Sequence, residues 1–142
     1  MTGPILGPPV PALVAARAYL RAELDARSNP LTVDVQPPAG EPAGYGLLSL
    51  LPSHQRSRFT VDYAIRVRVF DPDAVRCHQN TDLVWALMTS ATHRKVQTPL
   101  GAVWISAACP GEPGPSDLDD EDVPELFGLQ FSVFWTIALK PL

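Results

Sequence analysis

Acidic side chains are the most concentrated chemical groups in the chain. Seven of its fifteen acidic residues lie between Glu112 and Glu125, a stretch that contains no Lys or Arg. A calcium-binding EF-hand loop needs a glycine at its sixth position and a closing Glu. The run from Asp117 to Pro124 has no glycine and is stiffened by its proline. We therefore predict no dedicated metal site among its acids, which are Asp117, Asp119, Asp120, Glu121 and Asp122.

Thiol and imidazole groups are dispersed along the sequence. Cys77, Cys109 and the three histidines form none of the spacings typical of zinc sites. Cys77 and His78 are adjacent on a predicted helix, where neighbouring side chains point about 100° apart, so they are poor partners as nucleophile and base. The sequence also lacks hydrolase, phosphate-binding and dinucleotide-binding motifs. We predict no catalytic residue, no cofactor and no enzyme activity.

Four arginines lie close together in the middle of the sequence. Arg56 and Arg58 fall in a polar segment predicted to be a loop, and Arg66 and Arg68 share one face of a predicted strand. No aromatic residues alternate with them as in a nucleic-acid-binding surface, and the chain carries a net charge of −4. The pattern indicates a polar sheet face.

Two long segments alternate strictly between apolar and polar residues. Residues 59–70 and 127–139 carry apolar side chains at their odd positions, which predicts two strands that each bury one face. We expect these strands to pair or to be neighbours, with their odd-numbered residues beneath the helices. Asp71-Pro72-Asp73 predicts the start of a helix that runs to about Thr92, with Asp71 as the N-cap.

The remaining pattern completes a single α+β domain. An alanine-rich helix is predicted over 12–27, and shorter strands over 31–35, 46–51 and 96–108. The expected order is α-β-β-β-α-β-β, with two helices on one face of a largely antiparallel or mixed sheet. The domain spans 1–142, with a proline-rich arm at 1–11 and an acidic loop at 110–124.

The low content of charged residues indicates that the protein binds partners. Charged residues make up only 18% of the chain, below the roughly 25% of ordinary soluble domains, so much of the surface must be apolar or neutral. No apolar run is long enough to cross a bilayer, and the first residues lack the features of a signal peptide. We expect a protein of the cytoplasm that does not interact with membranes.

The order of elements resembles that of the tail terminator (tail completion) proteins of long-tailed bacteriophages. The residues that carry the resemblance are RFTVDYAIRVRVFDPDAVRCHQNTDLVWALM, from Arg58 to Met88, and VPELFGLQFSVFWTI, from Val123 to Ile137. The resemblance implies a virion protein, assembled in the host cytoplasm, that forms a hexameric ring at the head-proximal end of the tail. Its partners would be further copies, the tail tube protein and the head-side connector or stopper protein, while genomic DNA passes through without sequence-specific binding.

The sequence leaves other functions open. Head–tail stoppers and tail tube subunits share small α+β designs, and a small ligand-binding or enzymatic α+β domain is the less favoured reading. The acidic loop has three possible roles in a ring: a solvated loop, a lining of the channel that repels DNA, or a docking element. In the docking role it would meet a basic patch of a partner, or Arg56 and Arg58 of a neighbouring subunit.

Overall fold

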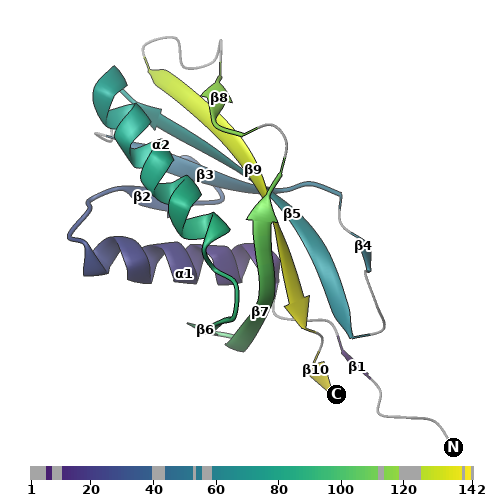
Figure 1. Ribbon diagram of the computed structural model, residues 1–142. Helices are drawn as coiled ribbons and strands as arrows, with labels where there is room; N and C mark the ends of the chain where they lie inside the picture. Colours follow the sequence, from purple (N-terminus) through teal and green to yellow (C-terminus); the bar gives the residue numbers. More distant parts are fainter. Residues whose placement is uncertain are drawn as a thin grey trace, which may run out of the picture.

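The protein has an α+β fold in which two helices pack on one face of a strongly twisted mixed sheet (Figure 1). The computed structural model describes residues 6–7, 11–39, 44–52, 54–55, 59–111, 114–118, 126–138 and 140–141. The helices are α1 (Ala12–Ala26) and α2 (Ala74–Thr89). The strands are β1 (Leu6–Gly7), β2 (Thr32–Asp34), β3 (Tyr45–Leu50), β4 (His54–Gln55), β5 (Thr60–Asp71), β6 (Arg94–Thr98), β7 (Gly101–Pro110), β8 (Ser116–Asp117), β9 (Phe127–Ala138) and β10 (Lys140–Pro141).

The main sheet has the strand order β2-β3-β5-β9-β7-β6, with β4 added beside β5 and β8 beside β9. Strands β2 and β3 are parallel, and the other described pairs are antiparallel. The expected order of the longer elements, α-β-β-β-α-β-β, is confirmed. The segment 96–108 was predicted as a turn and a strand, and it is a hairpin of two strands, β6 and β7, that turns at Pro99 and Leu100.

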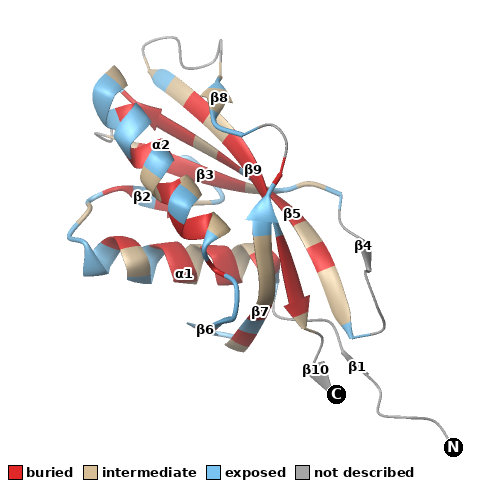
Figure 2. Ribbon diagram, viewed as in Figure 1, coloured by how far each residue is buried: buried red, intermediate tan, exposed pale blue. Residues whose placement is uncertain are grey.

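The two long strands pair over their full lengths, as expected. Thr60 lies opposite Ala138 at one end of the β5–β9 pair, and Asp71 lies opposite Phe127 at the other. Ile65 faces Val133 in the middle, and both side chains are completely buried beneath the helices. Figure 2 shows the buried residues along both strands and on the inner sides of the helices. The alternation therefore identified the core of the protein correctly.

Not every apolar residue of these alternating segments is buried. Phe59 and Phe127 were expected on the buried face, but they are 56% and 54% exposed. Val75, a candidate for burial in the second helix, is 65% exposed. Each lies near one end of the long β5–β9 pair, and a period of two cannot reveal where the helical cover stops.

Two large aromatic residues of the core, Trp135 and Tyr19, form hydrogen bonds through their polar groups. Trp135 donates from Nε1 to the carbonyl of Met88 at 2.8 Å, and the Tyr19 hydroxyl donates to the carbonyl of Leu87 at 2.7 Å. The two aromatic rings meet edge to face, with centroids 5.6 Å apart. These contacts link α1, the end of α2 and β9, and they use carbonyls that a helix end leaves unpaired.

The second helix begins two residues later than predicted. Asp73 is its N-cap, because its side chain accepts a hydrogen bond from the amide of Arg76 at 3.1 Å. Asp71, the predicted cap, is buried at the end of β5, where it accepts from the Asp73 amide and from Arg76 Nε, both at 2.8 Å. The helix ends at Thr89, three residues before the expected Thr92.

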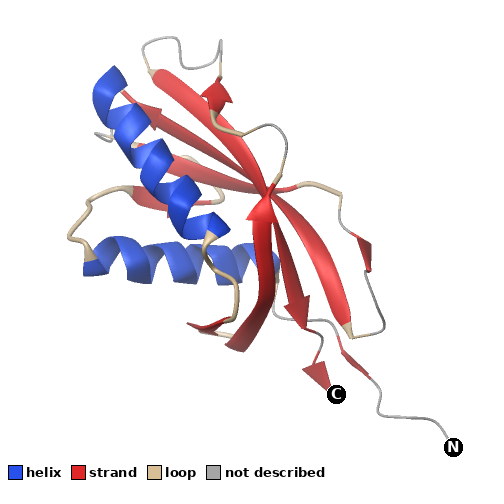
Figure 3. Cartoon of the chain, viewed as in Figure 1, coloured by secondary structure: helices blue, strands red, loops and turns tan. Residues whose placement is uncertain are grey.

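Short strands lie at the rim of the fold (Figure 3). Strands β1 and β10 pair with each other in a separate two-stranded sheet, so the described parts of the two ends of the chain lie side by side. The arm expected over 1–11 thus contains one paired dipeptide, whereas its residues 1–5 and 8–10 lie outside the described part.

Candidate functional site

The acidic loop is described only at its two ends. Asp117 lies in β8, exposed to solvent, whereas Asp119, Asp120, Glu121 and Asp122 lie outside the described residues. Part of the segment predicted as a loop over 110–124 is ordered into strands. Pro110 ends β7, and β8 pairs with β9 so that Ser116 lies opposite Gln130.

A small apolar cluster fixes both ends of this loop. Leu118 and Leu126 pack on a buried group of Tyr45, Leu47 and Phe70, on the face of the sheet away from the helices, here called the outer face. The amide of Leu118 donates to the carbonyl of Gly128 at 2.9 Å. A Cβ atom on Gly128 would lie 3.2 Å from the Leu118 carbonyl and from the Phe70 ring, so glycine lets the segment approach closely. Leu118 and Leu126, which flank the acidic segment 119–125 in the sequence, are therefore both held at one end of the sheet.

Of the four clustered arginines, two lie in the described part of the chain and two lie outside it. Arg56 and Arg58, the candidate inter-subunit residues, lie outside the described residues. Arg66 and Arg68 lie on the outer face, as their spacing predicts, opposite Ser132 and Gln130 of β9. Within the described part of the chain, Arg68 Nε is buried without a hydrogen-bond partner.

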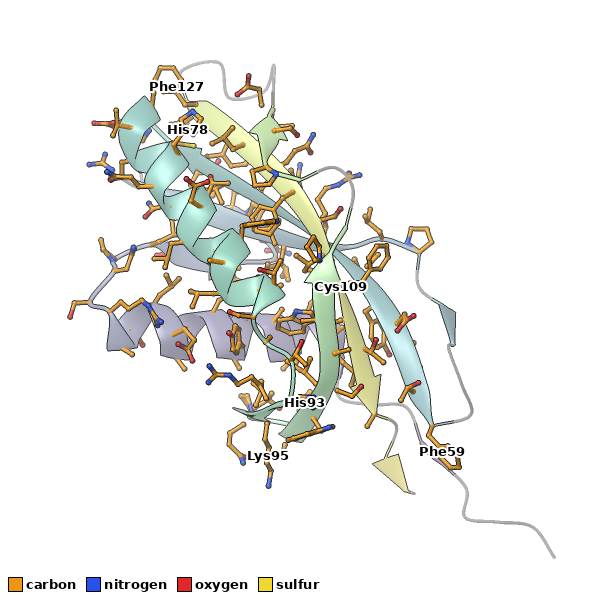
Figure 4. The ribbon with its side chains drawn as sticks, viewed as in Figure 1. Phe59, His78, His93, Lys95, Cys109 and Phe127 are labelled. Carbon is orange, nitrogen blue, oxygen red and sulfur yellow. The ribbon has the colours of Figure 1, made fainter. Side chains whose placement is uncertain are left out.

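Exposed aromatic and aliphatic residues mark the two ends of the long strand pair. Phe127 and His78 lie close together at the upper end of Figure 4, where α2 begins and β9 starts. Phe59 lies at the opposite end of the pair, and His93 and Lys95 lie at the lower end of the same view but well apart from Phe59. The two ends of the pair lie about 36 Å apart, because β5 and β9 each have twelve residues and a strand rises about 3.3 Å per residue.

The β6–β7 hairpin lies at the lower end of the molecule as drawn in Figure 4. Trp104 lies directly across from Lys95 in the hairpin and is 45% exposed. The ring of His93 lies 6.2 Å from the Trp104 ring, and His93 adopts a left-handed backbone conformation with φ of 61°. Arg94 lies 3.9 Å from Glu23 of α1. The hairpin thus carries a half-exposed tryptophan with a histidine ring tilted towards it and Lys95 across from it.

One pocket brings together thiol, imidazole and carboxyl groups. It has a volume of about 500 Å³ and lies between the start of α2, β8 and the start of β9, with Cys77, His78 and Asp117 in its lining. Sequence reasoning did not place Asp117 near the other two. The Cys77 thiol is 1% exposed and lies 3.5 Å from the carbonyls of Val69 and Phe127, so it points into the protein. Burial raises the pKa of this thiol, which disfavours the thiolate that a nucleophile needs.

The buried carboxyl group of Asp71 has a structural role. Besides its contact with Arg76, it lies against Gly44, where an added Cβ atom would come 2.5 Å from its Oδ2. The hydrogen bond and charge of Asp71 raise the pKa of Arg76. This pair joins the end of β5, the start of α2 and the chain entering β3.

Within the described residues, no group of three or more His, Cys, Asp or Glu side chains is placed to hold a metal ion. In the same part of the chain, neither helix has the length and apolar character needed to cross a membrane.

Comparison with known proteins gives no assignment: neither a protein-family model nor a curated protein matches the sequence.

Proposed function

We propose that the protein is a tail terminator of a long-tailed bacteriophage, which forms a ring at the head-proximal end of the tail. The observation that carries this proposal is the set of large apolar residues left exposed at both ends of the β5–β9 pair. Phe59, Trp104 and Phe127 are each about half exposed, and aromatic side chains of this kind are enriched where one protein contacts another.

The placement of the resembling segments supports the proposal. The segment from Arg58 to Met88 contains β5 and α2, and the segment from Val123 to Ile137 contains most of β9. These elements are far apart in the sequence, but they form the centre of the fold. The resemblance therefore concerns the structural core and the two strand ends.

In this role the ring ends growth of the tail tube, contacts the head-side connector or stopper protein, and lets genomic DNA pass through its channel. The protein would then be part of the virion neck, assembled in the host cytoplasm. An acidic loop near the channel would repel phosphate groups, but only over about 8 Å at physiological salt. A loop directed at a partner would instead contribute to docking.

Two alternatives make different predictions. Another neck or tail protein, such as a head–tail stopper or a tail tube subunit, would also assemble, but would not stop a growing tube. A ligand-binding or enzymatic domain would use the pocket beside Cys77. The inward orientation of that thiol and its raised pKa favour a structural role for Cys77.

The proposal is tested by polymerising the tail tube protein of the same virus with and without this chain. A terminator added during growth shortens the tubes and is found at one end of each tube in electron micrographs. A tail tube subunit would be incorporated along the tube, and a stopper would not bind bare tube ends. Either of these results would contradict the proposal.

A further inference from the structure

A band of polar side chains crosses the middle of the outer face of the sheet, and it is here called the arginine band. Its cations are Arg66 and Arg68 of β5. Ser49 of β3 and Ser132 of β9 lie opposite Arg66, and Gln130 of β9 lies opposite Arg68. Arg66 is exposed, and Arg68 and Gln130 are partly exposed. The band therefore presents two guanidinium groups among hydroxyl and amide groups.

The described residues do not neutralise the charge of this band. Neither of its arginines forms an ion pair with any of them. Asp62 of β5 and Asp34 of β2 also have outer-face positions in the register, but both are already engaged. Asp62 is 6% exposed and accepts a hydrogen bond from Thr136 at 2.5 Å, and Asp34 lies 3.3 Å from Arg17 of α1. The described part of the band is therefore locally positive, although the chain carries a net charge of −4.

A partly exposed aromatic ring borders the band. Phe134 of β9 is 39% exposed and lies opposite Ala64 of β5, one outer-face position from Arg66. Diagonal neighbours of this kind lie about 7–8 Å apart, within reach of aromatic and long side chains. The other neighbours of the ring are small, because Cys109 lies opposite it in β7 and a Cβ atom on Gly111 would come 3.2 Å from its edge. The sheet thus brings an aromatic ring beside the arginines, which the spacing within either strand does not reveal.

The chemistry of the band suits the backbone of a nucleic acid. Arginine, serine and glutamine side chains all donate hydrogen bonds to phosphate and sugar oxygens. Arg66 and Arg68 are two residues apart on one strand, so their backbones lie about 6.6 Å apart, a spacing comparable with that of successive phosphates. A protein interface is centred on apolar side chains, whereas every side chain of this band is a hydrogen-bond donor. Phe134 adds a ring on which an unpaired base can stack, as bases do on proteins that bind single strands.

We propose that the arginine band binds single-stranded nucleic acid without regard to sequence. Arg66 and Arg68 contact neighbouring phosphates, and Phe134 stacks on a base. Sequence-independent binding of this kind has a Kd of about 10⁻⁴–10⁻⁶ M and weakens as salt is added. The inference goes beyond the proposed role in the tail and does not depend on a ring, because it uses residues within one subunit.

The test is the fluorescence anisotropy of a labelled oligothymidine, titrated with the full chain at several salt concentrations. Arg66→Gln with Arg68→Gln removes both cations of the band. The matched control, Arg21→Gln with Lys95→Gln, removes the same charge from exposed positions on α1 and β6 that lie outside the band. Phe134→Leu removes the ring but keeps an apolar side chain. Circular dichroism checks that every variant is folded.

We expect the arginine variant to bind at least about tenfold more weakly than the natural sequence. Its slope of log K against log salt should be smaller by about 1.4, because two phosphate contacts are lost at about 0.7 each. Phe134→Leu should weaken binding at least about fivefold with an unchanged slope, because stacking involves no ions. The control should differ from the natural sequence by less than about twofold.

Three results would overturn the inference. The natural sequence does not bind, or the control loses as much affinity as the arginine variant, or another ligand binds better. The last is measured by competition with the matching duplex and with polyglutamate at equal charge. Stronger competition by polyglutamate than by unlabelled oligothymidine would assign the band to an acidic protein. The tail tube experiment is unaffected by any of these results, so the two proposals fail separately.

Discussion

At the scale of single residues, the sheet separates positions that carry the core from positions that face outward. Val133 and Phe134 are neighbours in β9, yet Val133 is completely buried beneath the helices and Phe134 is 39% exposed on the outer face. The alternation of side chains along a strand produces this contrast. The same charge placed at the two positions should therefore have very different effects.

Val133→Asp would bury a carboxylate without a partner. We expect it to cost several kcal/mol of a total stability of about 5–15 kcal/mol, and so to yield insoluble or unfolded protein. Phe134→Asp, the matched control, should remain soluble and folded. Urea denaturation followed by circular dichroism measures both, and a cooperatively folded Val133→Asp protein would contradict the assigned core.

The two cysteines provide a second test at this scale. Cys77 is buried with a raised pKa, whereas Cys109 is exposed on the outer face. At pH 8, a thiol reagent should modify Cys109 quickly in the native protein and Cys77 only at the rate of unfolding. Cys109→Ser and Cys77→Ser variants identify each reaction by mass spectrometry. Equal rates at the two sites would show that the Cys77 pocket is open to solvent.

The raised pKa of Cys77 also predicts how stability depends on pH. A group with a higher pKa in the folded state contributes fully below its unfolded pKa, and this contribution is lost as pH rises towards the folded value. Unfolding free energy should therefore fall as pH increases above about 8.5, the ordinary thiol pKa. Cys77→Ser should show a smaller fall than the natural sequence, and an identical fall would assign the effect to other groups.

At the scale of elements, the sequence predicted those helices and strands that a repeated spacing of apolar residues marks. Strands β5 and β9 and both helices follow from periods of two and 3.6 over a dozen or more residues. Strand β8 has two residues and no period, so its pairing depends on the cluster around Phe70 and on Gly128. The shift of register near Ser106 in β7 is likewise a property of the folded sheet.

The segment before α2 is another place where residue types alone do not determine the structure. Asp71 and Asp73 flank a proline, and either can cap a helix by its residue type. Only the fold determines that Asp71 is buried against Gly44 and Arg76. Asp71→Ala should reduce unfolding free energy by about 2–3 kcal/mol, because two hydrogen bonds to a buried carboxylate are lost. Asp73→Ala should reduce the unfolding free energy by about 1 kcal/mol, because the N-cap hydrogen bond is lost. Thermal denaturation measures both variants, and a larger loss in Asp73→Ala than in Asp71→Ala would contradict these roles.

The acidic loop can be tested as an element. Replacing Asp117, Asp119, Asp120, Glu121 and Asp122 by Asn or Gln removes five charges. If the loop docks on a basic patch of a partner or of a neighbouring subunit, that association weakens and its dependence on salt decreases. If the loop lines the channel, rings form normally but retain DNA at low salt. Unchanged assembly, partner binding and DNA retention would leave only a solvated loop.

At the scale of the whole molecule, the account joins three properties. Charged residues make up only 18% of the chain, seven of the fifteen acidic residues lie between Glu112 and Glu125, and several large apolar side chains are exposed. These properties suit a subunit whose surface is partly covered by copies of itself. The central claim is therefore that the purified chain closes into a ring.

The most direct test is the mass and shape of the purified full chain at micromolar concentration. Mass photometry should give a species of six times 15.4 kDa, about 92 kDa, and negative-stain images should show closed rings with a central channel. A folded monomer of 15.4 kDa at these concentrations, with no rings in the images, would contradict the account.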